Sequence, residues 1–279
     1  MATSIPDSPH RSSLLDRIRP AHAADFAFEA VTFFFALSVL VLIVLMFAEM
    51  VRSSWMTIAK YGLGFVYGTD WNPPADQFGA LPFVYGTIVS SAIALVIAVP
   101  ISIAVALFVT YQAPAVLRRP VISMVELLAA IPSVAYGLWG IFVLVPFMRE
   151  TVAPPIIKAF GSFPLFEGPS YGVGMLTSGL ILAIMVTPII TAVSRDVLAA
   201  VPQHQRDGAL ALGATQWEAI RVVFLYALPG ITGAIILGLA RAVGETMAVT
   251  MVIGNRSEIN ASLFAPGYSM ASVIANEFP

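Results

Sequence analysis

Five long apolar runs constrain the fold of this chain more than any other feature of its sequence. They lie at about residues 27–51, 84–110, 120–147, 171–194 and 229–253. A bilayer core about 30 Å thick needs about 20 residues of helix to cross it, and each run is long enough. Hydrophobic residues make up 58% of the 279 positions and charged residues only 11%, far below the roughly 25% of soluble domains. The sequence therefore predicts an all-α integral membrane protein.

Charge and residue content exclude several classes of function. The 14 Lys and Arg residues are balanced by 16 Asp and Glu residues, so the basic excess of a nucleic-acid-binding protein is missing. The chain has no cysteine, and His10, His22 and His204 lie outside the apolar runs, so we expect no metal site in the membrane. Neither lysine stands in a Gly-x-x-x-x-Gly-Lys-Ser/Thr loop. We therefore expect no catalytic residues, and no metal or nucleotide bound by this chain itself.

The positions of Lys and Arg predict how the runs are oriented, because cytoplasmic segments carry an excess of both. With the N-terminus inside, eight lie in inner segments, five lie in outer segments, and Arg241 lies in the fifth run. We therefore expect residues 1–25 to be a cytoplasmic tail. Five spans then leave residues 254–279 outside without a closing element, so we expect a sixth span to be missing at the C-terminus. The inner eight are Arg11, Arg17, Arg19, Arg118, Arg119, Arg195, Arg206 and Arg221.

The segment 195–228, between the fourth and fifth runs, is predicted to form a helix, a glycine break and a second helix. Pro202 suits the start of the first helix and Gly213 suits the residue after its end. Thr215-Gln216-Trp217-Glu218 has the spacing of a capping box, so the second helix should begin there and run toward Pro229. Four apolar side chains need cover from a protein partner or from lipid headgroups, and spacing alone leaves both open. They are Ala209, Leu210, Leu212 and Trp217.

This segment resembles the cytoplasmic loop of ABC importer permeases, whose pattern is Glu-Ala-Ala, three residues, Gly, nine residues, Ile, one residue, Leu-Pro. Asp207-Gly208-Ala209 stands three residues before Gly213, and Val223 and Leu225 take the Ile and Leu positions. The chain departs from the pattern in having Asp207 for Glu and Tyr226 for Pro. The resemblance implies a coupling helix that docks in a groove of a separate ATPase subunit. The residues implied in this coupling are Asp207, Gly208, Ala209, Leu212, Gly213 and Trp217.

Several further motifs resemble the permeases of phosphate-specific importers, and among their two related subunits the C-type. The resemblance covers about residues 60–279 and implies a type I ABC importer permease bundle of six spans, with residues 26–279 as its transmembrane domain. The motifs are Trp71-Asn72-Pro73, residues 78–83 (FGALPF), residues 126–139 (ELLAAIPSVAYGLW), residues 168–172 (GPSYG) and residues 238–248 (GLARAVGETMA).

The same resemblance implies the function and the partners. It implies a permease subunit that forms part of the pathway for inorganic phosphate in a bacterial inner membrane, surrounded by lipid. The implied partners are a second homologous permease subunit, two ATPase subunits that bind ATP and magnesium, and an external phosphate-binding protein. No nucleic acid is expected among them.

Arg241 and Glu245 are the charges that stand out in the fifth run. Arg241 is twelve residues from either end of this run, or about 18 Å at about 1.5 Å per residue, which predicts a position near the bilayer centre. A charge there costs at least about 2.5–3.5 kcal/mol and has to face protein or water. Glu245 follows one turn later on the same face, so the two can pair. The pair either fixes helix packing or belongs to the substrate pathway, and the resemblance favours the pathway.

Glu126 is the other charge within an apolar run, about 9 Å from the inner end of the third run at about 1.5 Å per residue. We expect its side chain to extend toward the cytoplasmic interface rather than to take part in the pathway. Pro132, Ser133 and Tyr136 lie deeper in the same run and are candidates for a gate or for helix packing.

Other functions fit the sequence less well. An ion-coupled secondary transporter would also accommodate a pair of charges in the membrane, but it predicts inverted repeats and paired broken helices, which the sequence does not show. A structural membrane protein would not need the buried charges. Within the ABC class, a permease for sulfate, molybdate or phosphonate is the alternative, and the Trp71 and Arg241–Glu245 motifs disfavour it.

Overall fold

The computed structural model describes residues 20–277. The chain divides into two compact units, of which the first ends at Leu63 and the second begins at Gly64. The first unit consists of α1 (Pro20–Ser53) and the short α2 (Trp55–Tyr61). Pro20 suits the first turn of α1, where backbone N–H groups have no intrahelical partner. Most of the predicted tail 1–25 lies outside the described residues, and the last six residues of that range belong to α1 instead.

The side chains of α1 are exposed from Asp25 to Ser53, apart from one half-buried position. None of its most apolar 18-residue window is buried within the chain. A helix that is apolar on every side needs an apolar environment around it. The first unit is therefore suited to crossing a membrane, as the sequence predicts.

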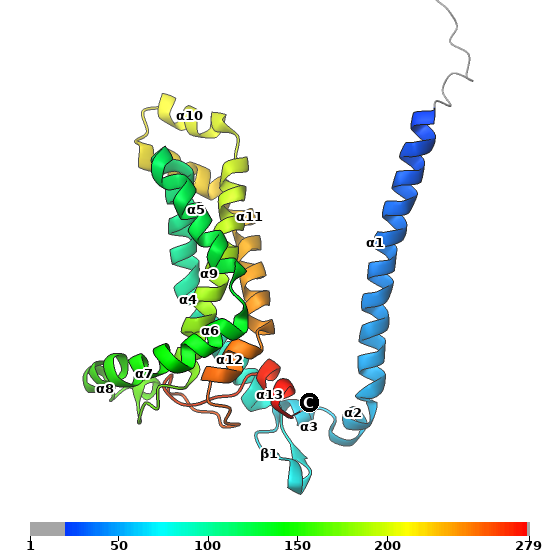
Figure 1. Cartoon of the computed structure of the whole chain (residues 1–279), viewed down its shortest axis with the longest axis vertical. Coiled ribbons are helices and arrows are strands. Elements are labelled where there is room, and N and C mark those ends of the chain that lie inside the picture. Colours follow the sequence, from blue (N-terminus) through cyan, green and yellow to red (C-terminus); the bar gives the residue numbers. More distant parts are fainter. Residues whose placement is uncertain (1–19, 278–279) are drawn as a thin grey trace, which may run out of the picture. The chain divides into compact units, whose positions relative to one another are not determined.

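The second unit is a helical bundle with shorter elements at both ends (Figure 1). Its three long helices are α4 (Leu81–Leu107), α9 (Met175–Ala200) and α11 (Gln216–Gly244). At one end lies α10 (Gln203–Ala211), and at the other lie α12 (Met247–Val252) and α13 (Met270–Glu277). The remaining elements are α3 (Gly64–Tyr67), β1 (Trp71–Asn72), η2 (Pro73–Ala75), β2 (Gln77–Phe78), η3 (Phe108–Gln112), α5 (Ala115–Ala130), α6 (Ser133–Trp139), η4 (Gly140–Leu144), α7 (Val145–Phe147), η5 (Met148–Val152), α8 (Ala153–Phe160) and η6 (Pro164–Phe166).

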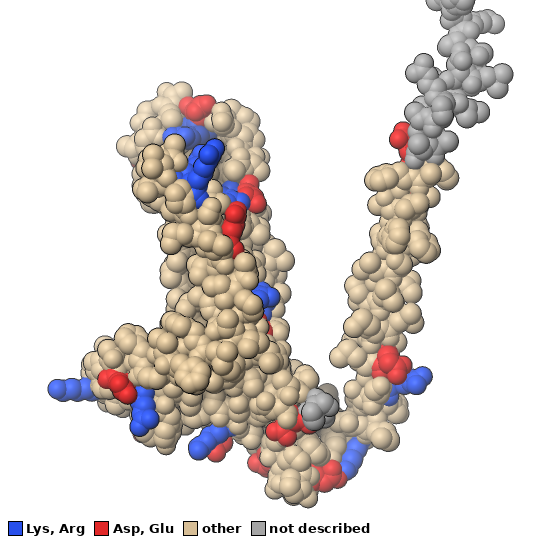
Figure 2. Space-filling model, viewed as in Figure 1, with Lys and Arg blue, Asp and Glu red and all other residues tan. Residues whose placement is uncertain are grey.

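Five helices in the described part of the chain are long and apolar enough to cross a membrane, which confirms the predicted number of spans. Charged side chains of the second unit gather mainly at its two ends, with few between them (Figure 2). The sixth span stays a prediction. The five helices run over Asp25–Ser53, Leu81–Gln112, Ser133–Phe160, Met175–Ala200 and Gln216–Gly244.

Small residues bring the three long helices of the second unit close together. Gly179 of α9 lies against Ile93 of α4, and Gly238 of α11 lies against Ile190 of α9, with no room for a Cβ at either glycine. Such close approach increases van der Waals contact, which matters because lipid supplies little hydrophobic driving force for helix association. Gly244 of α11 makes no such approach to the described residues, since the space around its Cβ position is open.

The predicted third span at 120–147 does not form as one helix. α5 ends at Ala130 and α6 begins at Ser133. Pro132 disfavours the helical conformation in the residue before it, and Ile131 is extended, with φ −69° and ψ 128°. The helix of membrane length starts after this break, at Ser133, and continues to Phe160.

The predicted fifth span at 229–253 is also divided differently. The helix that begins behind Thr215 does not end near Pro229 but continues as α11 to Gly244. Glu245 then leaves the helical conformation, with ψ 126°, and the chain resumes as α12. The second helix of the 195–228 loop and most of the fifth span are therefore a single helix.

Candidate functional site

Arg241 and Glu245 form an ion pair at the end of α11. Arg241 Nη2 lies 3.8 Å from Glu245 Oε2. The Glu245 side chain is 8% exposed, whereas the Arg241 side chain is 46% exposed. The pair is present as the sequence predicts, and it is unequal, with a buried carboxylate and a guanidinium that is half open to its surroundings.

The local backbone explains why these two residues meet. Arg241 lies in the last turn of α11, where unpaired carbonyls give the helix end a partial negative charge that favours a cation. Glu245 is the residue at which the helix ends, and its side chain turns back toward Arg241. The predicted position of Arg241, twelve residues from either end of a span, is wrong, because the helix is Gln216–Gly244 and not 229–253.

Arg241 keeps most of its hydrogen-bonding capacity. A guanidinium has five N–H donors, and the Glu245 contact at 3.8 Å is longer than a hydrogen bond. Within the described residues Arg241 makes no hydrogen bond. Its donors are therefore available to an oxyanion, which a guanidinium binds through paired N–H groups.

The candidate gate residues lie around the break between α5 and α6. The Tyr136 hydroxyl donates a 2.8 Å hydrogen bond to the Leu128 carbonyl in the last turn of α5, which also accepts a longer one, 3.4 Å, from Ile131 N. Pro132 and Ser133 are at the start of α6. Gly137 packs closely on Ala248 and Met251 of α12, the helix that follows Glu245. The contact of α6 with α12 therefore connects the break between α5 and α6 to the helix that follows Glu245.

Glu126 has a partner that the sequence analysis missed. Its Oε1 lies 3.8 Å from Nη1 of Arg195, and its side chain is 63% exposed. Arg195 also donates two 3.0 Å hydrogen bonds to Asp196 Oδ1. In the sequence, Glu126 and Arg195 both lie near the predicted inner ends of their spans, and this shared location is the signal that they could meet. An exposed pair of this kind contributes about 0–1 kcal/mol.

The α10 segment has the helix, glycine break and helix that its sequence predicts. Gly213 has φ +88°, and two backbone hydrogen bonds close the end of α10: Gly213 N to Leu210 O at 3.0 Å and Ala214 N to Ala209 O at 3.1 Å. This is the Schellman arrangement, in which glycine takes the left-handed position at no steric cost. At the start of α11, Thr215 and Glu218 form the predicted capping box.

The predicted coupling residues face two ways. Leu212 is 91% exposed and Trp217 is 64% exposed, so neither is covered within this chain. Asp207 lines a cavity between α10 and the bundle. Gly208 has open space at its Cβ position, and Ala209 is half-buried.

No catalytic or metal site emerges from the described residues. Residues 168–172 (GPSYG) match the Gly-x-Ser-x-Gly pattern of hydrolases. That motif requires a strand before the serine and a helix directly after it, whereas this segment is a loop between η6 and α9, and Ser170 Oγ accepts a 3.3 Å hydrogen bond from Gly172 N. No group of three or more potential metal ligands is found in the described residues.

Comparison with known proteins gives consistent matches along the chain. Residues 98–274 match the family described as binding-protein-dependent transport system inner membrane component. A phosphate transport system permease protein PstC from Pasteurella multocida is 46% identical over 262 residues, covering 92% of this chain and 82% of the relative. The PstC protein of Mesorhizobium japonicum is 47% identical over 273 residues, covering 96% and 84%. A probable PstC protein of Methanocaldococcus jannaschii is 37% identical over 245 residues, covering 86% and 78%.

Proposed function

The chain belongs to the family of binding-protein-dependent transport system inner membrane components and is a membrane permease subunit of a phosphate importer of the ABC class, and on this premise we propose that Arg241 contacts the phosphate during its passage. Glu245 balances the charge of Arg241 when no phosphate is bound. The observation that carries the proposal is the unequal exposure of the pair, 46% for Arg241 and 8% for Glu245.

The chemistry of phosphate fits a half-exposed guanidinium. The planar fork of N–H donors on arginine matches two oxygens of a phosphate, and arginine stays charged at any physiological pH. A permanent cation among apolar helices is costly wherever it is shielded from water. The partner carboxylate at 3.8 Å offsets part of that cost.

Glu245 also supports release of the anion. A guanidinium without a counter-charge would hold phosphate strongly, and a substrate that is bound too tightly leaves slowly. The carboxylate stays within reach of Arg241 Nη2 and competes with phosphate for the guanidinium. The pair therefore favours weak, reversible binding, which suits a pathway better than a storage site.

α10 provides the link to ATP hydrolysis in this proposal. It is a short helix at the end of the bundle, and the exposed Leu212 and Trp217 lie on either side of the glycine break that follows it. Apolar side chains clustered at an exposed turn are typical anchors for a protein partner. The proposed partner is one of two ATPase subunits, which bind ATP and magnesium in place of this chain, so that the assembled complex is an ATP-hydrolysing translocase.

The remaining partners and the orientation follow from the same proposal. A second homologous permease subunit completes the pathway, and an external phosphate-binding protein delivers the substrate. The N-terminus and α10 face the cytoplasm, in line with the eight Lys and Arg residues of the inner segments against five in the outer segments. The protein is a multi-pass inner membrane protein, with lipid around its apolar helices.

Uptake of labelled phosphate into vesicles that contain the complete complex tests the proposal. We expect uptake that requires ATP and an intact ATPase subunit, and that unlabelled sulfate, molybdate and phosphonate in excess do not suppress. Uptake driven by an ion gradient without ATP would point to a secondary transporter. Suppression by another oxyanion at the same excess would assign the permease to that substrate.

A further inference from the structure

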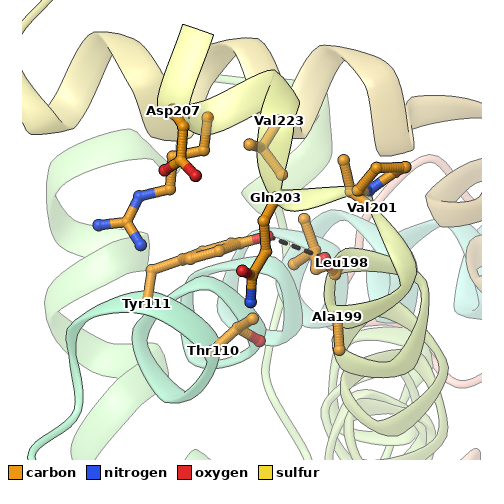
Figure 3. A pocket seen from close by; sticks show the side chains of 10 residues that line it. Thr110, Tyr111, Leu198, Ala199, Val201, Gln203, Asp207 and Val223 are labelled. Atoms are coloured by element: carbon orange, nitrogen blue, oxygen red, sulfur yellow. Dashed lines mark hydrogen bonds between the residues drawn. The ribbon is translucent and has the colours of Figure 1, made fainter. Parts of the chain in front are cut away.

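A cavity of about 320 Å³ lies behind α10, between this helix and the ends of α4 and α9 (Figure 3). Its lining is mixed, with apolar side chains such as Leu198 and Val223 beside several polar groups. The polar lining residues are Thr110, Tyr111, Gln203, Arg206 and Asp207. Two of these, Tyr111 and Arg206, join the helices around the cavity.

Tyr111 ties the end of α4 to the end of α9. It lies in η3, which continues α4, and its hydroxyl donates a 2.8 Å hydrogen bond to the Leu198 carbonyl (Figure 3). Leu198 is in the last turn of α9, and its carbonyl also accepts a longer hydrogen bond, 3.4 Å, from Val201 N. The phenol therefore adds a second donor to the end of one helix from the end of another.

Arg206 ties α10 to this pair of helix ends and to α11. Its guanidinium carbon lies 5.8 Å from the centre of the Tyr111 ring, within the range of a cation–π contact. Its Nη2 donates a 2.8 Å hydrogen bond to Oε1 of Gln216, the first residue of α11. Its Nε is buried and meets no acceptor among the described residues. One side chain of α10 thus contacts both η3 and the start of α11.

The rest of α10 is only partly covered by the bundle. None of its residues is buried. Its backbone joins α9 through residues 201–202 and α11 through residues 212–215, and Gly213 stands within the second connection. A helix without buried apolar contacts, held by two short joints, can tilt on its own. The Arg206 contacts therefore contribute a large part of what fixes α10 to the bundle.

We propose that Arg206 is a positioning residue that makes α10 and the ends of α4 and α9 move together. The inference rests on the proposed function, in which α10 docks on an ATPase subunit. Arginine suits this role because its planar group stacks on a ring and donates hydrogen bonds in the same plane, which lysine does not do. The cavity leaves room for a shift of α10. Gln203 and Asp207 line the cavity and carry side-chain oxygens that can accept a hydrogen bond, and Arg206 Nε has no acceptor among the described residues.

Transport measurements with Arg206 variants test this role. In vesicles with the complete complex, phosphate uptake and ATP hydrolysis are measured together for Arg206→Ala, Arg206→Lys and Tyr111→Phe. We expect Arg206→Ala to lower the phosphate moved per ATP about tenfold, within the range of a typical coupling free energy, while ATP hydrolysis stays within about twofold. Arg206→Lys should be intermediate, and Tyr111→Phe, which keeps the ring, should be the mildest. Arg221→Ala removes an exposed arginine from the same end of α11 and serves as the matched control.

A distance measurement separates failure of this inference from failure of the proposed function. Because the chain has no cysteine, spin labels can be attached at Gln112→Cys and Ala211→Cys, two exposed positions at the end of α4 and on α10. We expect a narrow distance distribution in the otherwise unchanged complex and a broad one with Arg206→Ala, whatever the substrate is. An unchanged distribution, or equal losses of transport and hydrolysis in all variants and in the control, would overturn the inference.

Discussion

The two ends of α11 are built in different ways. At its start, the Thr215 backbone N–H donates a 2.8 Å hydrogen bond to Glu218 Oε2, and Glu218 N donates back to Thr215 Oγ1 at 3.3 Å. All partners there lie within four residues of one another. At its other end, the helix stops at Gly244, and Glu245 is buried beside the half-exposed Arg241. That arrangement contains a buried carboxylate, and no local sequence pattern at a helix end requires one.

The difference indicates which end carries the function. A capping box is worth about 1 kcal/mol and serves to start a helix. A buried carboxylate is costly unless it is paired, and a protein retains such a group where it has a use for it. We therefore expect changes at the Arg241 end to affect transport strongly, and changes at the Thr215 end to affect stability slightly.

The largest effect is expected at Arg241. Arg241→Gln removes the guanidinium that the phosphate contacts, and uptake per assembled complex should fall at least about 100-fold, as for the loss of one partner of a hydrogen-bonded charge pair. Hydrolysis of ATP by the complex should persist. Arg241→Lys is the matched control, because it keeps the charge and loses the fork, and it should retain part of the uptake. Wild-type uptake by the Arg241→Gln variant would show that the Arg241 end of α11 matters no more for transport than the Thr215 end.

A second large effect is expected at Gly213, the glycine break between α10 and α11, which sets the direction of α10. Gly213 has φ +88°, a conformation that proline cannot adopt, so Gly213→Pro should abolish transport while insertion into the membrane continues. Ala209→Asp should act in the same way by placing a charge in the proposed ATPase contact. Ala211→Asp puts the same charge about 200° around the helix, at about 100° per residue, and should be tolerated. Equal behaviour of the two Asp variants would argue against docking through one face.

Glu245→Gln should have a smaller and different effect. Removing the carboxylate leaves Arg241 without a competitor for phosphate, so uptake should slow while phosphate binding to the purified complex becomes tighter, by about tenfold for a shift of about 1.4 kcal/mol. The comparison of uptake rate with bound phosphate, both per assembled complex, checks this. A loss of assembled complex with unchanged binding would indicate that Glu245 serves folding alone.

The smallest effect is expected at the start of α11. Thr215→Ala removes the Oγ1 acceptor of Glu218 N and should cost about 1 kcal/mol of stability. The thermal midpoint of the purified complex should drop by about 2 °C, with phosphate uptake close to that of the wild type. Thr215→Ser keeps the hydroxyl and should restore the midpoint. A transport defect without a stability change would show that this end also has a direct role in function.

The sequence predicted those parts of the fold that depend on local signals. The apolar runs, the glycine break at Gly213 and the capping box at Thr215 each follow from residue types at fixed spacing, and the structure contains all three. The pairing of Arg241 with Glu245 was also predictable, because residues four apart on a helix lie on the same face.

The parts that the sequence did not predict depend on competition between local signals. Pro132 stands inside one apolar run and Pro229 at the start of another, yet the chain breaks at the first and continues through the second. At Pro132 the Tyr136 hydroxyl satisfies the Leu128 carbonyl on the far side of the break, a contact that no spacing rule gives. The end of α11 at Gly244 and the partner of Glu126 likewise depend on which helices pack together.

The most direct test of the account is uptake by the double variant Arg241→Gln with Glu245→Gln, measured per assembled complex beside both single variants. If Arg241 contacts phosphate, the double variant should assemble as well as the wild type, since no buried charge is left unpaired, and should still transport no phosphate. If the pair only stabilises the bundle, removal of both charges should restore uptake. Restored uptake would contradict the proposed role, because repacked glutamine side chains supply no positive charge to the anion.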